Sequence, residues 1–204
     1  MITIITNANR HEYEDEMDQM FRLRHRIFVE QLGWKLPEAR DGKEIDRFDT
    51  EDAIYLLSLD GDRKLLGSKR LLPTTQPHLM SEVFPHMVAG DVPAGPHIWE
   101  SSRSCVHPDC RDRGIIGHLF LAMVEVGLIM GIEKITFVAD MAFYPTILHA
   151  GWGVAPLGFP QVDETGAENI AACLTINPIS LRNMRHNYQV EHSMLNHLPL
   201  KAVG

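Results

Sequence analysis

The stretch HIWESSRSCVHPDCRDRGIIGHLFLAMVEVGLIMGIEKITFVA, residues 97–139, decides the fold. Residues 98–106 predict a strand, and residues 111–117 lead into an apolar helix that ends at Gly131. Residues 134–139 then predict a second, buried strand. An alternation of strand and helix is typical of a sheet with helices packed on its faces.

Similar patterns lie on both sides of this stretch. Residues 2–6 predict a strand, residues 14–32 an amphipathic helix closed by Gly33, and residues 53–73 a hairpin that turns at Asp60 and Gly61. A further strand over residues 171–176 and short helices after Pro145 and Pro178 complete the pattern. The sequence therefore predicts an α/β (or α+β) fold.

The composition indicates one compact domain that spans residues 1–204. With 19 Lys and Arg against 27 Asp and Glu, the net charge is −8, which argues against nucleic acid as a partner and favours a cationic ligand. No apolar run reaches the roughly 20 residues of a membrane span, and the N-terminus lacks the features of a signal peptide. Three cysteines form a sparse, odd set, so we expect free thiols and a cytoplasmic location.

Arg24 lies in the apolar stripe of its predicted helix, between Phe21 and Phe28. A guanidinium directed into an apolar region needs a carboxylate or phosphate partner, and its planar fork suits a bidentate carboxylate. The alternative is that only the aliphatic stem packs and the charged head reaches solvent.

The irregular stretch from Trp34 to Asp52 carries Asp46 and Asp49 close to Phe48. A solvated acidic loop is the simplest interpretation of such a charge run. Aromatic rings beside carboxylates can instead hold a cation. The order of residues differs from that of an EF-hand, so we expect no calcium site.

On the strand 98–106, regular alternation sends Glu100 and Arg103 to opposite faces, and a bulge would bring them to one side. Glu100 is a candidate general base or a member of a structural salt bridge. Ser101 and Ser102 lie beside it, but the chain has no G-x-S-x-G motif, so a serine nucleophile is not expected.

Two other motifs give weaker signals. The segment from Arg111 to Gly117 joins a strand to a helix, where backbone amides can cradle a pyrophosphate. The set Cys105-x-His107-x2-Cys110 has no second pair of ligands nearby, so we expect no metal.

Taken in order, these residues resemble the N-acyl-homoserine-lactone synthases, the autoinducer synthases of bacterial quorum sensing. The resemblance covers about residues 10–160. The matching motifs are Arg24-His-Arg-Ile-Phe28, Leu32-Gly-Trp34, Asp46-x-x-Asp49, Tyr55-Leu, Gly67-Ser-x-Arg70-Leu-Leu-Pro-Thr, Phe84 and Ile98-Trp-Glu100-x-Ser-Arg103. The family's fold is similar to that of the GNAT acyltransferases, which implies a mixed β-sheet with a central cleft flanked by helices.

The resemblance implies a two-step reaction on S-adenosylmethionine. The α-amine attacks an acyl thioester, and the carboxylate oxygen then closes on the γ-carbon and expels methylthioadenosine. S-adenosylmethionine is a substrate, so no cofactor is implied. The implied catalytic residues are Arg24, Asp46, Asp49, Arg70, Glu100 and Arg103. The implied substrate-binding residues are Phe28, Trp34, Phe84, Ser102, Val138 and Ala139.

The roles follow from the same resemblance. Asp46, Asp49 and the rings of Phe28 and Trp34 would hold the ammonium and sulfonium groups, and Arg24 would clamp the carboxylate. Glu100 would remove the amine proton, directly or through water. Arg70 and Arg103 would order the acidic loop and the sheet cleft.

The donor would be an acyl carrier protein or acyl-CoA. Residues 136–140 would line the acyl pocket, and because no threonine hydroxyl stands near its end, we expect a chain without a 3-oxo group. The candidate docking charges for an acidic carrier protein are Lys64, Lys69, Arg111 and Arg113. Two alternatives stay open: a GNAT-type N-acyltransferase acting on another amine, and a ligand sensor without enzymatic activity.

Overall fold

The computed structural model describes residues 1–196 and divides the chain into two compact units. Unit 1 comprises residues 1–70, residues 103–122 and the segment that begins at Ser193. Unit 2 comprises residues 71–102 and 123–192. A single domain over residues 1–204 stays a prediction.

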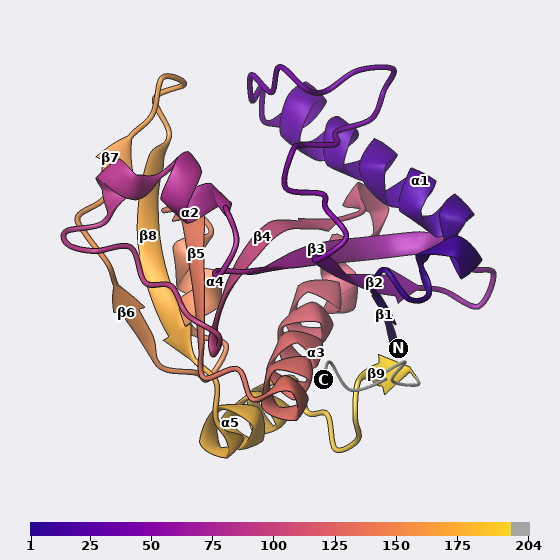
Figure 1. Ribbon diagram of the computed structural model, residues 1–204. Coiled ribbons are helices and arrows are strands. Elements are labelled where there is room, and N and C mark those ends of the chain that lie inside the picture. The colour runs from indigo at the N-terminus through magenta and orange to yellow at the C-terminus, as the bar shows by residue number, and fades with distance from the viewer. Residues whose placement is uncertain (197–204) are drawn as a thin grey trace. The chain divides into compact units, whose positions relative to one another are not determined.

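Unit 1 is built on a small mixed sheet (Figure 1). Strand β1 (Ile2–Ile5) pairs antiparallel with β2 (Ile54–Leu59), with Ile2 opposite Ser58, and parallel with β9 (Leu195–Asn196). Asp60 turns the chain from β2 into β3 (Leu65–Pro73), because its carboxylate accepts the N–H groups of two residues in the turn. The predicted hairpin is therefore confirmed.

The predicted helix over residues 14–32 is also confirmed, but it has two parts. Helix α1 (Glu14–Arg24) continues directly as a π-helix, η2 (His25–Gln31). Buried residues at helical spacing form the inner face, and three acids in the first turn suit the positive end of the helix dipole. A short 3-10 helix, η1 (Arg10–Glu12), precedes α1, and Figure 1 shows α1 lying along β2 and β3.

Strand β4 (Ile98–Val106) and helix α3 (Ile115–Met130) carry residues of both units. Between them lies the 3-10 helix η4 (Pro108–Arg113). Gly67 on β3 lies in close contact with Cys105 on β4 and Ile115 on α3. A Cβ at Gly67 would stand 2.9 Å from both the Cys105 carbonyl oxygen and Ile115 Cγ2, so only glycine fits there.

Unit 2 holds a second group of paired strands in the order β6 (Val154–Pro156), β8 (Glu168–Thr175), β5 (Lys134–Asp140) and β4. Strand β5 pairs parallel with β4 and antiparallel with β8, so this part is also mixed. The remaining elements of unit 2 are α2 (Leu79–Glu82), η3 (Pro85–Met87), α4 (Tyr144–Leu148), β7 (Gln161–Val162) and α5 (Pro178–Tyr188). The predicted mixed α/β fold is confirmed.

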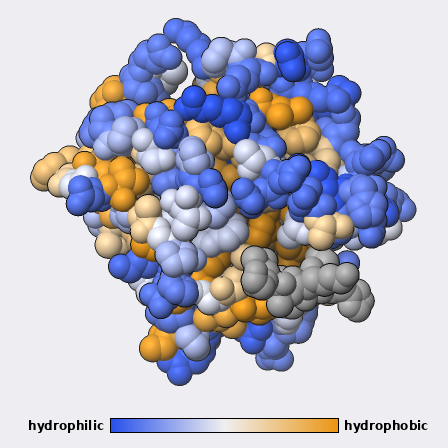
Figure 2. Space-filling model, viewed as in Figure 1, coloured by the Kyte–Doolittle hydropathy of each residue, from blue (hydrophilic) through white to orange (hydrophobic). Residues whose placement is uncertain are grey.

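The sequence patterns missed α2 and the three shortest strands, β6, β7 and β9. Each has at most four residues, too few to show a period. Figure 2 shows a visible face on which hydrophilic residues predominate and apolar residues form separate patches. No helix within residues 1–196 is both long and apolar enough to cross a membrane.

Candidate active site

Arg24 is the centre of a buried network in unit 1. Its side chain is fully buried, and its Nε donates to Glu44 Oε2 at 2.6 Å. Its Nη1 and Nη2 donate to the two carboxylate oxygens of Asp49 at 2.8 and 2.9 Å. The predicted guanidinium that meets carboxylates inside the protein is confirmed, and the alternative of a head reaching solvent is wrong.

Two further arginines complete the network. Arg70 donates to both oxygens of Asp46, at 2.6 and 2.9 Å, and its Nη1 lies 2.8 Å from Asp49. Arg103 donates to Asp46 at 2.8 Å and to Glu44 at about 3.1 Å. We call these six residues the arginine–carboxylate cluster: Arg24, Glu44, Asp46, Asp49, Arg70 and Arg103.

The arginine–carboxylate cluster has three positive and three negative groups, and none of its side chains is more than 9% exposed. Burial alone would raise the pKa of Asp49, but the charges of Arg70 and Arg24 outweigh it and hold that pKa well below its usual range. Burial would likewise lower the pKa of Arg24, and Asp49 and Glu44 raise it instead. The charges of Asp49 and Arg24 are thus retained inside the protein.

Two residues that take part in this network are not among the predicted site residues. Glu44 is 1% exposed and bridges Arg24 and Arg103, and its backbone N–H donates to the Phe21 carbonyl on α1. Tyr55 on β2 is fully buried, and its hydroxyl donates to Asp49 at 2.9 Å. The signal for Glu44 is its place two residues before Asp46 in the acidic run, and the signal for Tyr55 is the Tyr55-Leu motif.

An aromatic pair lies against the arginine–carboxylate cluster. Phe28 and Trp34 stack with ring centroids 4.8 Å apart and an angle of 14° between the planes. The Arg103 guanidinium carbon lies 5.7 Å from the first ring centroid and 5.9 Å from the second. Gly33, which follows the π-helix, has a φ of 68° and turns the chain back. The Trp34 backbone N–H then donates to the Phe28 carbonyl, and the two rings meet.

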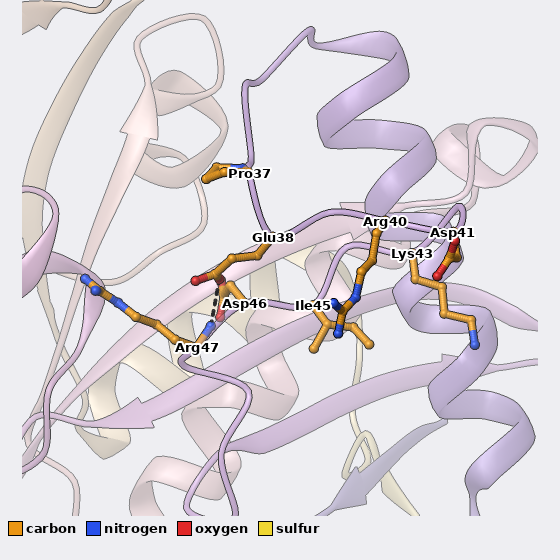
Figure 3. Close-up of a pocket in the computed structure, with 8 residues that line it drawn as sticks. All are labelled: Pro37, Glu38, Arg40, Asp41, Lys43, Ile45, Asp46 and Arg47. Carbon is orange, nitrogen blue, oxygen red and sulfur yellow. Dashed lines mark hydrogen bonds between the residues drawn. The ribbon is translucent and has the colours of Figure 1, made fainter.

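The loop between Trp34 and Asp52 borders an open pocket of about 540 Å³, which we call the polar cavity because six of the eight residues that line it are charged (Figure 3). Its lining includes three acids and three bases: Glu38, Asp41, Asp46, Arg40, Lys43 and Arg47. The Glu38 carboxylate joins two parts of the loop, because it accepts the Arg47 backbone N–H at 2.9 Å. Asp46 belongs to both the cavity and the arginine–carboxylate cluster, so one carboxylate connects the two.

Glu100 lies in unit 2 and is 1% exposed. Its two carboxylate oxygens accept the backbone N–H groups of Leu79 and Met80, at 2.7 and 2.9 Å. Glu100 on β4 therefore fixes the first turn of α2 by two hydrogen bonds. Within the same strand Arg103 has a φ of 50°, so the regular alternation is interrupted at that residue.

Four of the predicted substrate-binding residues, Phe84, Ser102, Val138 and Ala139, also lie in unit 2. Val138 and Phe84 pack against a buried cluster of Met80, Met87 and Ala171. Ala139 is the next residue of β5 and pairs with Ile170 on β8, and Ser102 is partly buried on β4. The structure thus brings Phe84 and Val138 together in one apolar cluster, which we call the methionine cluster.

The candidate docking charges differ in exposure. Lys64, Arg111 and Arg113 are exposed, but Lys69 is only 4% exposed and its Nζ lies 5.1 Å from the centroid of the Phe120 ring. Lys69 as a docking charge is therefore wrong, because β3 points it into the interior of unit 1. Burial lowers the pKa of Lys69 to about 7.

The segment from Arg111 to Gly117 joins η4 to α3 through Gly114, whose φ is 69°. Arg111 donates to Gln31 Oε1 at the end of the π-helix, at 3.2 Å. All three cysteines are free thiols, as predicted. Within residues 1–196 no group of three His, Cys, Asp or Glu side chains is arranged to hold a metal ion.

Comparisons with known proteins show which family this chain resembles. The family model "Autoinducer synthase" matches residues 8–182. The isovaleryl-homoserine lactone synthase of Bradyrhizobium diazoefficiens is 44% identical over 177 residues, which are 86% of this chain and 80% of the relative. An acyl-homoserine-lactone synthase of Rhizobium etli is 34% identical over 77% of this chain and 76% of the relative.

A solved structure supports the same assignment. The CoA-dependent acyl-homoserine lactone synthase BjaI, with S-adenosylmethionine and isopentyl-CoA, has a TM-score of 0.91 and 40% identity over 98% of this chain and 95% of its own. The predicted GNAT-like fold class is thereby confirmed. The chain belongs to the autoinducer synthase family, and it is an acyl-homoserine-lactone synthase.

Proposed function

We propose that this enzyme joins S-adenosylmethionine to an acyl thioester and releases methylthioadenosine. The amine nitrogen attacks the thioester carbonyl and expels the thiol, and the carboxylate oxygen then attacks the γ-carbon and expels methylthioadenosine. The observation that carries the proposal is the Phe28–Trp34 pair beside the buried arginine–carboxylate cluster. A related synthase, BjaI, has been solved with S-adenosylmethionine and isopentyl-CoA, and also with methylthioadenosine.

We infer that the aromatic pair binds the sulfonium group. Aromatic faces attract a cation without adding a charge. The arginine–carboxylate cluster has no excess of acid to do so, since its three carboxylates face three arginines. Trp34 is only partly buried, which leaves part of its ring accessible to a ligand.

The polar cavity fits the amino acid end of the same substrate. This end carries an ammonium and a carboxylate, and the cavity presents acids and bases in equal numbers. Its volume of about 540 Å³ is in the range of small-molecule sites. Asp46 is the candidate for the ammonium, because it lines the cavity and is fixed by Arg70.

The geometry changes the role we propose for Arg24. Its N–H groups already donate to Glu44 and Asp49, so a substrate carboxylate would have to displace one of them. We therefore assign Arg24 a positioning role, as the residue that fixes the acidic loop on α1. Arg40, an exposed cation of the cavity, is a better candidate for the carboxylate.

Glu100 remains our candidate for the base that removes the amine proton, directly or through water. Its two carboxylate oxygens accept the backbone N–H groups of Leu79 and Met80, at 2.7 and 2.9 Å. The two bonds also fix the carboxylate relative to α2. Removal of the proton is required, since an ammonium has no lone pair for attack.

We propose that the donor is acyl-CoA and that the acyl chain is short and lacks a 3-oxo group. The relatives named above include an isovaleryl-homoserine lactone synthase and a CoA-dependent synthase. The methionine cluster is apolar and offers no hydroxyl group to a 3-oxo oxygen. We further propose that the reaction needs no cofactor and takes place in the cytoplasm.

The experiment is an assay of purified protein with S-adenosylmethionine and isovaleryl-CoA, with products identified by mass spectrometry. An acyl-homoserine lactone and methylthioadenosine in equal amounts are expected. The same acyl group on a carrier protein should react more slowly. A 3-oxo product from a mixed pool of thioesters would contradict the proposed acyl chain.

A pair of aromatic variants tests the sulfonium site. Trp34→Ala should raise the KM for S-adenosylmethionine about ten-fold, the size of a cation–π contact. Phe159→Ala is the matched control, because that ring is 86% exposed and lies in the other unit. Equal effects of the two variants would argue against the proposed site.

A further inference from the structure

The His78 imidazole is a buried polar side chain with one unpaired nitrogen. The residue is 2% exposed, and its Nδ1 lies 2.9 Å from the Gln76 carbonyl oxygen. A carbonyl oxygen only accepts hydrogen bonds, so Nδ1 carries the proton and Nε2 has a free lone pair. His78 Nε2 is buried and has no hydrogen-bond partner within the described residues.

An unpaired buried acceptor is unusual, because the large majority of buried side-chain polar atoms have a partner. The backbone of His78 is well fixed. Its N–H donates to Ser81 Oγ at 3.1 Å, and the Ser81 hydroxyl donates back to the His78 carbonyl at 2.9 Å. The ring is held through Nδ1, which lies 2.9 Å from the Gln76 carbonyl oxygen and 3.2 Å from the Ser81 hydroxyl, so Nε2 is left for a partner that arrives with a ligand.

The position of His78 points to the acyl donor. His78 directly precedes α2, whose first amides are held by Glu100 and whose Met80 belongs to the methionine cluster. Figure 1 shows α2 beside β5, the strand that carries Val138. Methionine side chains adapt readily to an incoming chain, and Met80 is only two residues from His78.

We propose that His78 Nε2 binds the acyl donor by accepting a hydrogen bond from an amide N–H of its pantetheine arm. This inference rests on the proposed function, in which the second substrate is an acyl thioester. Acyl-CoA and an acylated carrier protein both carry this arm, so the contact is the same for either donor. A neutral imidazole nitrogen suits an uncharged N–H donor, and the bond would satisfy the one unpaired atom of the ring.

Two substitutions separate the functions of the ring nitrogens. His78→Asn keeps an N–H donor near the position of Nδ1, for Gln76, and removes Nε2. His78→Gln extends an amide group toward the position of Nε2. Steady-state kinetics with S-adenosylmethionine and isovaleryl-CoA should give a KM for isovaleryl-CoA about ten-fold higher for His78→Asn, with the KM for S-adenosylmethionine and kcat within about two-fold. His78→Gln should recover part of the loss, and the melting temperature of both variants should stay near that of the wild type.

A second thioester identifies the group that His78 binds. The isovaleryl thioester of ethanethiol has no amide N–H, so wild type and His78→Asn should use it equally well. An equal loss on both thioesters would overturn the proposal and indicate a bound water. A fall in kcat with an altered pH profile and unchanged KM would also overturn it, because that result indicates a base. Failure of the wild type to form any lactone would instead refute the proposed function.

Discussion

Asp49 joins two of the three arginines of the arginine–carboxylate cluster, Arg24 and Arg70, and its side chain is 1% exposed, so Asp49→Asn is an informative substitution. Asp49 accepts hydrogen bonds from both Nη atoms of Arg24, from the Tyr55 hydroxyl and from the Asp46 backbone N–H. It also lies 2.8 Å from Arg70. Asparagine keeps the size of the side chain but leaves two carboxylates to balance three buried guanidiniums.

The cost follows from the loss of that charge. Removing one partner of a buried ion pair costs about 3–5 kcal/mol, and because the asparagine oxygen keeps some of the bonds, we take about 3 kcal/mol. For a chain of this size, each kcal/mol lowers the melting temperature by about 2–4 °C, so a fall of about 6–12 °C is expected. The melting temperature can be measured at pH 7 by circular dichroism.

The matched control is Asp18→Asn, another aspartate with two basic partners, Arg22 and Lys43. Its side chain is 37% exposed, and exposed pairs contribute at most about 1 kcal/mol. We expect a change of less than about 4 °C. If the two variants melted at the same temperature, the buried cluster would not stabilise the protein as argued.

The pH dependence gives a second test of the same reasoning. The folded protein holds the pKa of Asp49 below that of the unfolded chain, so this carboxylate contributes stability above about pH 4, and the contribution is lost in stronger acid. The difference in unfolding free energy between wild type and Asp49→Asn should therefore be largest near pH 7 and shrink below pH 4. A constant difference would refute the role of its charge.

Three further substitutions test other features of unit 1, each by thermal or denaturant unfolding. Tyr55→Phe removes one hydrogen bond to Asp49 and should cost about 1–2 kcal/mol, which equal stability would contradict. Lys69→Met should raise stability at pH 7 by roughly 2–4 kcal/mol. The pKa of Lys69 is about 7 when folded and about 10.4 when unfolded, so wild-type stability rises between these values and the difference should vanish near pH 10. Gly67→Ala forces a Cβ to 2.9 Å from the Cys105 carbonyl and should cost about 1–3 kcal/mol; an unchanged melting temperature would show that the strand can move.

The order of helices and strands could be predicted from the sequence wherever an element was long enough to repeat its pattern. The burial of Arg24 could be predicted too, because its neighbours on the helix are apolar. The identity of its partners could not. Glu44 and Asp49 lie 20 and 25 residues away in an acidic run, and their pairing depends on how an irregular loop folds back on α1. A local pattern carries no information about such a contact.

The roles of Glu100 and Arg103 show a second limit. Regular alternation assigns them to opposite faces of a strand, and the positive φ of Arg103 breaks that rule. A residue with a side chain rarely adopts such a conformation, so the sequence contains no sign of it. Likewise, the two bonds from Glu100 to α2 depend on a four-residue helix that has no period to detect.

The net charge of −8 suggests an acidic surface for a cationic substrate, but the buried site does not use it in that way. Every carboxylate of the arginine–carboxylate cluster faces an arginine, and the lining of the polar cavity is balanced as well. Because Asp46 belongs to both groups, together they hold six bases and five acids. Such a site does not attract a cation at long range, so on our proposal it selects a sulfonium by contact with the Phe28 and Trp34 rings. Buried and short-range contacts are only weakly screened by salt. The KM for S-adenosylmethionine should therefore change little between low and moderate ionic strength, whereas attraction by the acidic surface would make it rise with salt.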